Sequence, residues 1–154
     1  MTNKSYNDKL NDSKDMPKLV DLSDKPDFVA RVGGPLMLIA PPLAYNDIMA
    51  RVPEGKIITS DRIRDYLAKQ ADANTTCSLT AGIFINICAN ASFEREDDQI
   101  PYWRTLKSKG QLNEKFPEGT DGQKALLEIE GHKVVKKGNK YFLKDYEKYL
   151  WEIE

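Results

Sequence analysis

Histidine, cysteine and long apolar runs are all scarce in this sequence. It has 154 residues, with one histidine and two cysteines. If Cys77 and Cys88 share a helix, about three turns separate them, which is too far for a disulfide. Because His132 is the sole histidine, we expect neither a zinc site within the chain nor any other metal or cofactor.

The sequence also lacks a segment that could span a membrane. The longest apolar candidate, Leu36 to Leu43, is interrupted by two prolines. The beginning of the sequence does not have the charged-then-apolar layout of a signal peptide. We therefore expect a cytoplasmic protein without a membrane partner.

No excess of one charge sign is present. Lysine and arginine total 23 and aspartate and glutamate total 24, for a net charge of -1. A chain that is not a polycation can bind nucleic acid only through a local basic patch. The length suits a single domain with a real core and is too short for two comfortable ones. We expect a monomer.

Composition divides the sequence into three parts. Residues 1–15 are Asn, Lys, Asp and Ser with almost no apolar content, and they are predicted to be a disordered tail. Residues 16–44 carry apolar pieces broken by glycines and prolines. They are predicted to form an arm that packs on the domain, with a short strand or turn near Met37. The domain itself is predicted over residues 45–154.

Within that domain, helical patterns precede a basic hairpin. Helices are predicted over 45–52, over 60–70 with Ser60 and Asp61 as caps, from Thr75 or Thr76 to about 93, and over 120–131. Residues 133–143 are predicted to be a hairpin that turns at Gly138-Asn139, and residues 145–153 a short helix. This order predicts an α/β fold with a winged helix-turn-helix.

The most informative stretch begins at Ile100. It reads Ile100-Pro101-Tyr102-Trp103-Arg104, then Leu112-Asn113, Phe116-Pro117-Glu118-Gly119, Gln123-Lys124-Ala125-Leu126-Leu127 and Glu130-Gly131-His132. This string resembles the active-site region of the methylated-DNA–protein cysteine methyltransferases. Those proteins carry Ile-Pro-Cys-His-Arg-Val, a Gly-Gly turn and Lys-x-x-Leu-Leu-x-x-Glu-Gly.

The resemblance extends upstream and covers roughly residues 52–143. The segment from Val52 to Ser60 is similar to the family's turn Ile-Pro-x-Gly-x-Val-x-Thr-Tyr, with Ser60 where the tyrosine that helps rotate the target nucleotide stands. Leu79-Thr80-Ala81-Gly82 lies in the place of the family's Arg-Ala-Val-Gly. The family's arginine fills the gap left by the flipped base, and Leu79 could do so as an apolar wedge.

The resemblance implies a protein without transferase activity. Tyr102 stands at the position of the nucleophilic cysteine, and Trp103 at that of the histidine that activates it. A phenol with an ordinary pKa near 10 is a poor nucleophile at neutral pH. Alkyltransferase-like proteins also replace the cysteine, yet bind alkylated guanine and recruit repair factors, although they typically keep the histidine. An active transferase that uses Cys77 as a displaced nucleophile is the least favoured alternative.

The first hypothesis is therefore a non-catalytic DNA-binding protein that recognises an altered guanine. The base would stack in a pocket lined by Tyr102 and Trp103. The other candidate DNA contacts are Leu79, as the wedge, and a set of polar or basic side chains, namely Arg104, Ser60, Ser78, Thr80, Asn86 and the hairpin residues Lys136 and Lys137. Ser78 and Thr80 would contact phosphates near the start of a helix, and asparagine could read adenine.

The second hypothesis is a protein-interaction module, with a repair protein as its partner and no DNA binding. The same residues also have plain structural interpretations: a packed aromatic pair, a mostly buried helix over 75–93 and a solvated hairpin. The position of the charge distinguishes the two hypotheses. DNA binding is favoured if Lys136, Lys137 and Arg104 share a face with the beginning of that helix. The partner is favoured if the acidic loop 94–98 covers that face.

Overall fold

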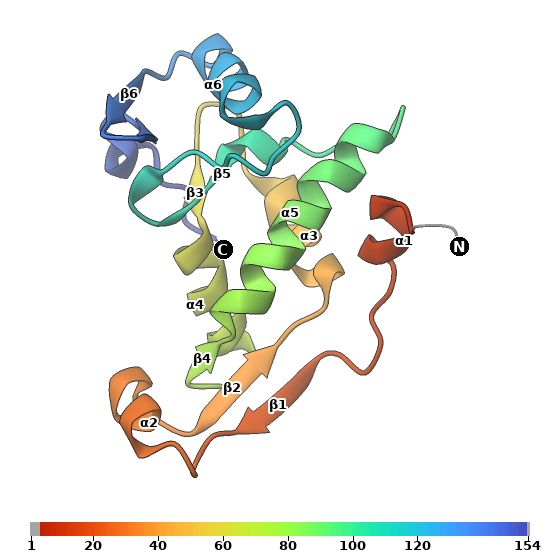
Figure 1. Cartoon of the computed structure of the whole chain (residues 1–154), viewed down its shortest axis with the longest axis vertical. Helices are drawn as coiled ribbons and strands as arrows, with labels where there is room; N and C mark the ends of the chain where they lie inside the picture. Colours follow the sequence, from red (N-terminus) through yellow and green to blue (C-terminus); the bar gives the residue numbers. More distant parts are fainter. Residues whose placement is uncertain (1–3, 154) are drawn as a thin grey trace.

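The computed structural model describes residues 4–153 and shows an α/β arrangement of short helices and small sheets (Figure 1). The helices are α1 (Tyr6–Leu10), α2 (Pro26–Val32), α3 (Pro42–Arg51), α4 (Ser60–Gln70), α5 (Ser78–Glu94) and α6 (Gly119–Ile129). The strands are β1 (Lys18–Asp21), β2 (Leu36–Ile39), β3 (Ile58–Thr59), β4 (Thr75–Thr76), β5 (Thr105–Leu106), β6 (Val134–Lys137) and β7 (Lys140–Leu143). Short 3₁₀ turns lie at η1 (Tyr102–Arg104), η2 (Ser108–Gly110) and η3 (Tyr146–Tyr149).

The strands form three small sheets. β1 pairs antiparallel with β2, and β2 pairs parallel with β4, which joins the N-terminal segment to the middle of the chain. β3 pairs parallel with β5. β6 and β7 form the predicted hairpin, with Val134 opposite Leu143 and Lys137 opposite Lys140. The strand expected near Met37 is β2.

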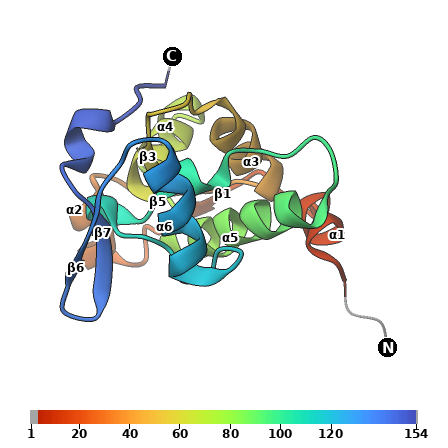
Figure 2. The same cartoon turned by 90° about the horizontal axis from the view of Figure 1, so that it is seen from above.

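The helix-turn-helix consists of α4, the short strand β4 and α5. α4 packs against both β4 and α5, and α3 also packs against α5. The polypeptide then returns through η1 and β5 to α6 and the hairpin. Figure 2 shows the hairpin and α1 on opposite sides of the molecule, with α5 lying between them.

The prediction of a disordered tail over residues 1–15 is wrong for the described part, residues 4–15; residues 1–3 lie outside the described range. α1 begins with a capping box, in which the Ser5 side chain accepts from the Asp8 amide and the Asp8 carboxylate accepts from the Ser5 amide. Leu10 is buried in the core. The composition of the segment missed this helix because its main partner is α5, far along the chain.

Several helix starts also differ from the predicted caps. Ser60 is already the first residue of α4, and Thr59 precedes it without a side-chain cap. Thr75 and Thr76 form β4, because they pair with β2, and α5 starts only after Cys77. α6 begins at Gly119, after Glu118 in a left-handed conformation. Sheet pairing and turns therefore decided these boundaries over capping preference.

The core has two parts that meet at one side chain. The larger lies among α3, α4 and α5 and includes Tyr45, Ile63 and Cys88. The smaller lies beneath the hairpin; its buried members are Ile57, Leu106, Leu112, Leu127 and Leu143. Trp103 packs against both clusters, so it joins the helix-turn-helix to the hairpin region. Between residues 4 and 153, no helix is both long and apolar enough to cross a bilayer.

Candidate functional site

The helix α5 has an exposed apolar edge near its beginning. It carries no charged residue before Glu94. The plain structural interpretation predicts a mostly buried helix, but among its larger side chains Ile83 is exposed, Phe84 and Ile87 are half-buried and Cys88 is buried. Leu79 is 72% exposed and Ile83 is 48% exposed. Large apolar side chains at such exposure, one helical turn apart, form a surface that can be covered by a ligand.

A cavity of about 310 Å³ lies beside this edge. It is bounded by the first half of α5, by Ser60 and by the segment 105–115. Ser78, Leu79 and Asn86 all line it, so the structure brings together four of the residues predicted from the sequence. Thr80 lies on the same first turn of α5 without lining the cavity, and its hydroxyl is 3.4 Å from the Cys77 carbonyl oxygen.

An asparagine network fixes the wall of the cavity opposite α5. Asn113 donates from Nδ2 to Asn86 Oδ1 at 2.8 Å, and its own Oδ1 accepts from the Lys115 amide at 2.9 Å. Asn90 donates to the carbonyl oxygens of Asn86 and Lys115 at 2.9 and 3.1 Å. Asn86 therefore holds the segment 105–115 against the helix through its side-chain oxygen. Both its side-chain oxygen and its backbone oxygen already accept hydrogen bonds within the protein.

Gln123 supports the same wall from below and is fully buried. Its Oε1 accepts from the Asn113 amide at 2.7 Å, and its Nε2 donates to the carbonyl oxygens of Trp103 and Thr105, both at 3.1 Å. This one buried amide thus joins η1, β5 and the loop that lines the cavity.

We expect Gln123→Leu to lower the free energy of unfolding by at least about 2 kcal/mol, because it leaves buried backbone groups without partners at about 1–3 kcal/mol each. Urea unfolding measures this change. Gln70→Leu, at an exposed position on α4, is the matched control and should change stability by less than about 0.5 kcal/mol. Equal stability of the two variants would show that the amide does not hold the loop.

Lysines supply the charge that α5 lacks. Lys107 and Lys115 line the cavity on the side of the loop, and Lys107 is paired with Glu114 at 2.9 Å. Lys4, Lys9 and Lys14 lie on the other side of α5, on the N-terminal segment. Our sequence analysis missed these three, although lysine recurs at five-residue intervals through an otherwise polar segment.

Tyr102 and Trp103 lie outside this cavity. Tyr102 is 7% exposed and packs edge-to-face between Trp103 and Phe116, with ring centroids 5.4 and 5.7 Å away. Both line a different cavity of about 560 Å³, which also touches Phe93 and Pro117. The residues predicted to form the base pocket and the residues of α5 predicted to contact DNA therefore line two separate hollows.

The chemistry at Tyr102 and Trp103 does not favour nucleophilic attack. Burial raises the pKa of the Tyr102 phenol, which moves it further from the phenolate at neutral pH. Trp103 donates from Nε1 to Glu130 Oε2 at 2.8 Å. Since an indole N–H donates but has no lone pair to accept a proton, Trp103 cannot act as a general base.

Arg104 forms an internal ion pair. Its Nη2 lies 2.8 Å from Glu130 Oε2, its Nε is 3.0 Å from both carboxylate oxygens, and its Nη1 donates to the Val52 carbonyl oxygen at 2.8 Å. Glu130 also accepts from the Gly55 amide at 3.1 Å. This arrangement argues against the predicted role of Arg104 in DNA contact, because its guanidinium is committed to the protein.

Lys136 and Lys137 are exposed on the hairpin. Each ammonium lies over a ring of the facing strand, Lys136 over Tyr141 at 5.8 Å and Lys137 over Phe142 at 5.6 Å. Figure 1 places the hairpin at the upper end of the molecule, whereas α5 begins near the sheet at the lower end. These lysines therefore do not adjoin Ser78 and Leu79.

The acidic loop does not cover the beginning of α5 either. Glu94 is the last residue of this 17-residue helix, at the opposite end from Ser78. Its carboxylate accepts from the amides of Tyr6 and Asn7 at 3.1 and 3.2 Å, which are free donors in the first turn of α1. The structure therefore shows neither Lys136, Lys137 and Arg104 beside the beginning of α5 nor the acidic loop covering it. The basic side chains near α5 are instead the lysines that flank it.

Cys77 is half-buried just before α5. Burial raises the pKa of its thiol, but hydrogen bonds from Thr80 and from the Leu79 and Thr80 amides outweigh it, so that the pKa is lowered. Cys77 lines neither cavity described above. Within the described residues, no cluster of three or more His, Cys, Asp or Glu side chains is arranged to hold a metal ion.

Comparisons with known proteins identify the fold. No family model matches the sequence, and no curated protein matches it. Among solved structures, S. pombe Atl1 in complex with damaged DNA containing O6-carboxymethylguanine superposes with a TM-score of 0.51 at 18% identity. S. pombe ATL in complex with DNA superposes with a TM-score of 0.50 at 18% identity. Each match covers 73% of this chain and 94% of the other. The chain therefore shares the fold of S. pombe Atl1, and the predicted α/β winged-helix class is confirmed.

Proposed function

We propose that this chain is a non-catalytic, alkyltransferase-like protein that binds double-stranded DNA and recognises an alkylated guanine. One observation carries the proposal: the fold is that of S. pombe Atl1 bound to damaged DNA, and the exposed edge of α5 adjoins a cavity at the positions where the resemblance implies nucleotide flipping. Leu79, Ser60 and Ser78 all lie at that cavity.

Leu79 is the wedge in this proposal. Its side chain projects from the first turn of α5 and is largely exposed. Apolar side chains of this kind enter the minor groove between base steps and unstack them. The displaced base would then have the 310 Å³ cavity beside it, a volume at the lower end of the roughly 300–1,000 Å³ range of ligand pockets.

Absence of transfer chemistry follows from the two aromatic residues. Tyr102 is buried with a raised pKa, and Trp103 has no acceptor for a proton. Both take structural roles, because Trp103 joins the two core clusters and Tyr102 fills the space between Trp103 and Phe116. Recognition of the lesion would therefore leave the DNA chemically unchanged.

Fluorescence anisotropy tests the proposal directly. Two short duplexes, one plain and one with a single 6-O-methylguanine, are titrated over a salt series. We expect binding to the modified duplex to be tighter by about tenfold, since stacking of a flipped base contributes about 1–3 kcal/mol. Equal affinity for both would contradict lesion recognition and leave a general DNA-binding domain.

Gly82 offers a way to close the cavity without disturbing the fold. It lines the cavity, and a Cβ built there would meet no atom within 4 Å. We expect Gly82→Leu to abolish the preference for the modified duplex while binding to the plain one persists, and Gly82→Ala to retain most of the preference. A full preference in Gly82→Leu would show that the base goes elsewhere, with the cavity beside Tyr102 and Trp103 as the remaining site.

A protein-interaction module is the second candidate. Phe93 is exposed beside the cavity lined by Tyr102 and Trp103, and no lysine lines that cavity. Such a surface fits an apolar segment of a repair protein. If the wild-type chain binds neither duplex at low salt, this candidate replaces the first.

A further inference from the structure

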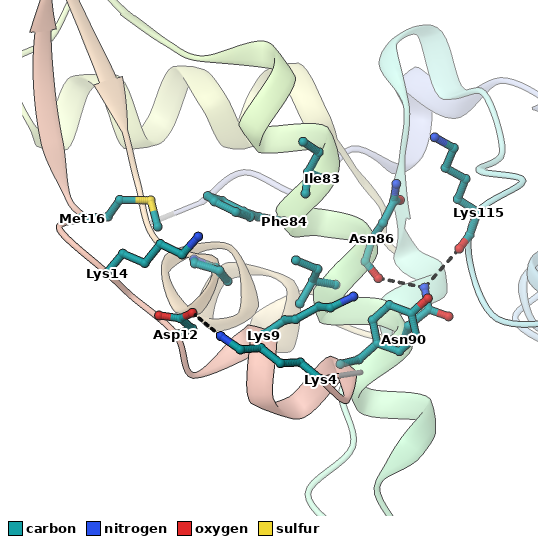
Figure 3. A pocket seen from close by; sticks show the side chains of 13 residues that line it. Lys4, Lys9, Asp12, Lys14, Met16, Ile83, Phe84, Asn86, Asn90 and Lys115 are labelled. Carbon is teal, nitrogen blue, oxygen red and sulfur yellow. Dashed lines mark hydrogen bonds and ion pairs between the residues drawn. The ribbon is translucent and has the colours of Figure 1, made fainter. Parts of the chain in front are cut away.

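A second hollow lies on the side of α5 away from the first cavity. It measures about 800 Å³ and lies between the N-terminal segment and α5 (Figure 3). Its floor is apolar, with Ile83, Phe84 and Ile87 from α5. Its rim is basic, and Figure 3 shows Lys4, Lys9, Lys14 and Lys115 around it.

The rim carries a positive charge that the protein does not neutralise. Asp12 is the one acid that lines the hollow, and it is paired with Lys4 at 3.1 Å. None of the ion pairs found within residues 4–153 involves Lys9, Lys14 or Lys115. All three side chains are exposed. Three such ammonium groups around one hollow are arranged to receive an anion with several charges.

The N-terminal segment is held in place by specific contacts. Asn7 donates from Nδ2 to the Ala91 carbonyl oxygen at 3.0 Å and accepts at Oδ1 from Arg95 Nη1 at 2.9 Å. Glu94 accepts from the first amides of α1, and Leu10 is buried against the core. Lys9 lies on α1 between Asn7 and Leu10, so these contacts fix the position of its backbone.

The two hollows share one wall. Ile83, Asn86 and Lys115 line both, so α5 forms a ridge between them. If α5 lies in a groove of the duplex, the two DNA strands pass on either side of this ridge. One strand then faces the segment 105–115, and the other faces Lys9 and Lys14.

We propose that the N-terminal segment is a phosphate-binding arm of the DNA interface, in which Lys9 and Lys14 contact phosphates of the strand opposite the base-binding cavity. This rests on the proposed function and adds to it the residues that supply non-specific affinity. The apolar floor suits deoxyribose and base faces, which accompany the phosphates of a nucleic acid but not a free inorganic anion. Contacts of this kind position the protein without reading sequence.

The test compares two double variants of equal charge change. The rim variant, Lys9→Gln/Lys14→Gln, removes two lysines of the rim. The control variant, Lys25→Gln/Lys69→Gln, removes two other exposed lysines: Lys25 directly precedes α2, and Lys69 lies on α4. Affinity for the plain and modified duplexes is measured from low to moderate salt. We expect the rim variant to bind both duplexes about tenfold more weakly at low salt. Its slope of log affinity against log salt should be shallower by roughly 0.9 per lost contact.

A third variant and a stability measurement complete the design. Lys9→Arg/Lys14→Arg keeps both charges and should bind as the wild type does, and thermal unfolding should show that α1 remains docked in every variant. If the rim and control variants have the same affinity and salt slope, the arm is not part of the interface, although the proposed function stands. If the wild-type chain itself binds no duplex, the proposed function fails and the arm with it.

Discussion

Replacing Glu130 by glutamine is expected to lower the free energy of unfolding by about 3–5 kcal/mol, the usual consequence of removing one partner of a buried ion pair. The Glu130 and Arg104 side chains are only 5% and 14% exposed. Glutamine leaves the Arg104 guanidinium without a counter-charge and weakens the acceptor for Trp103 and the Gly55 amide. Urea unfolding followed by tryptophan fluorescence measures the loss at neutral pH.

Glu128→Gln is the matched control for this prediction, because Glu128 is exposed near the end of α6, two residues before Glu130. Its expected effect is within about 0.5 kcal/mol. If the free energy of unfolding of Glu130→Gln also lay within about 0.5 kcal/mol of the wild-type value, the ion pair would not stabilise the link between η1 and the turn at Gly55.

The pH dependence of stability provides an independent check on Glu130. Burial raises the pKa of the Glu130 carboxyl, but hydrogen bonds from Arg104, Gly55 and Trp103 outweigh it, so that the pKa in the folded protein lies below the usual value. A depressed pKa means that the stabilisation is fully present above the unfolded value, about 4.3, and is lost as the pH falls through the folded value. The stability difference between wild type and Glu130→Gln should therefore shrink in acid, below about pH 4.3.

Placing a negative charge at Leu79 should weaken DNA binding about tenfold to a hundredfold. Glutamate there would remove the apolar wedge, whose insertion is comparable to base stacking at about 1–3 kcal/mol, and would add repulsion from nearby phosphates. Leu79 is 72% exposed, so the fold should tolerate the change. Anisotropy titrations with the plain duplex measure it.

Two companion variants make this result specific. Leu79→Arg should bind as tightly as the wild type or more so, since a guanidinium can contact phosphates and an orphaned base. Ile129→Glu alters an isoleucine that is 80% exposed on α6, away from both hollows beside α5, and should leave affinity unchanged. If Leu79→Glu and Ile129→Glu bind equally well, α5 does not enter the DNA.

Local patterns in the sequence predicted much of the domain. The hairpin turn at Gly138-Asn139, the helix over 60–70 and the helix that ends before Gly131 all lie where residue types indicated, because each depends on contacts between near neighbours. The motif around Tyr102 and Trp103 likewise led to the fold, which the comparison with S. pombe Atl1 confirmed.

Other features depended on partners far apart in the chain. Apolar side chains occur on every side of α5, so its sequence has no periodicity that could show Leu79 and Ile83 to be exposed rather than buried. Glu94 and Asn7, 87 residues apart, fix the segment whose composition predicted disorder. The 26-residue separation of Arg104 and Glu130 hid the ion pair that the Arg104 guanidinium forms within the protein.

The sequence by itself therefore determined the hairpin and the longer helices of the domain, which residues replace the cysteine and histidine of the resembled family, and that any nucleic-acid affinity must be local. Only the tertiary structure decided that Tyr102 and Trp103 line a different hollow from Ser60, Ser78 and Leu79, and that lysines of the N-terminal segment flank α5. The reason is physical: helix and turn preferences act over a few residues, whereas burial, ion pairing and the shape of a cavity are set by which distant segments pack together.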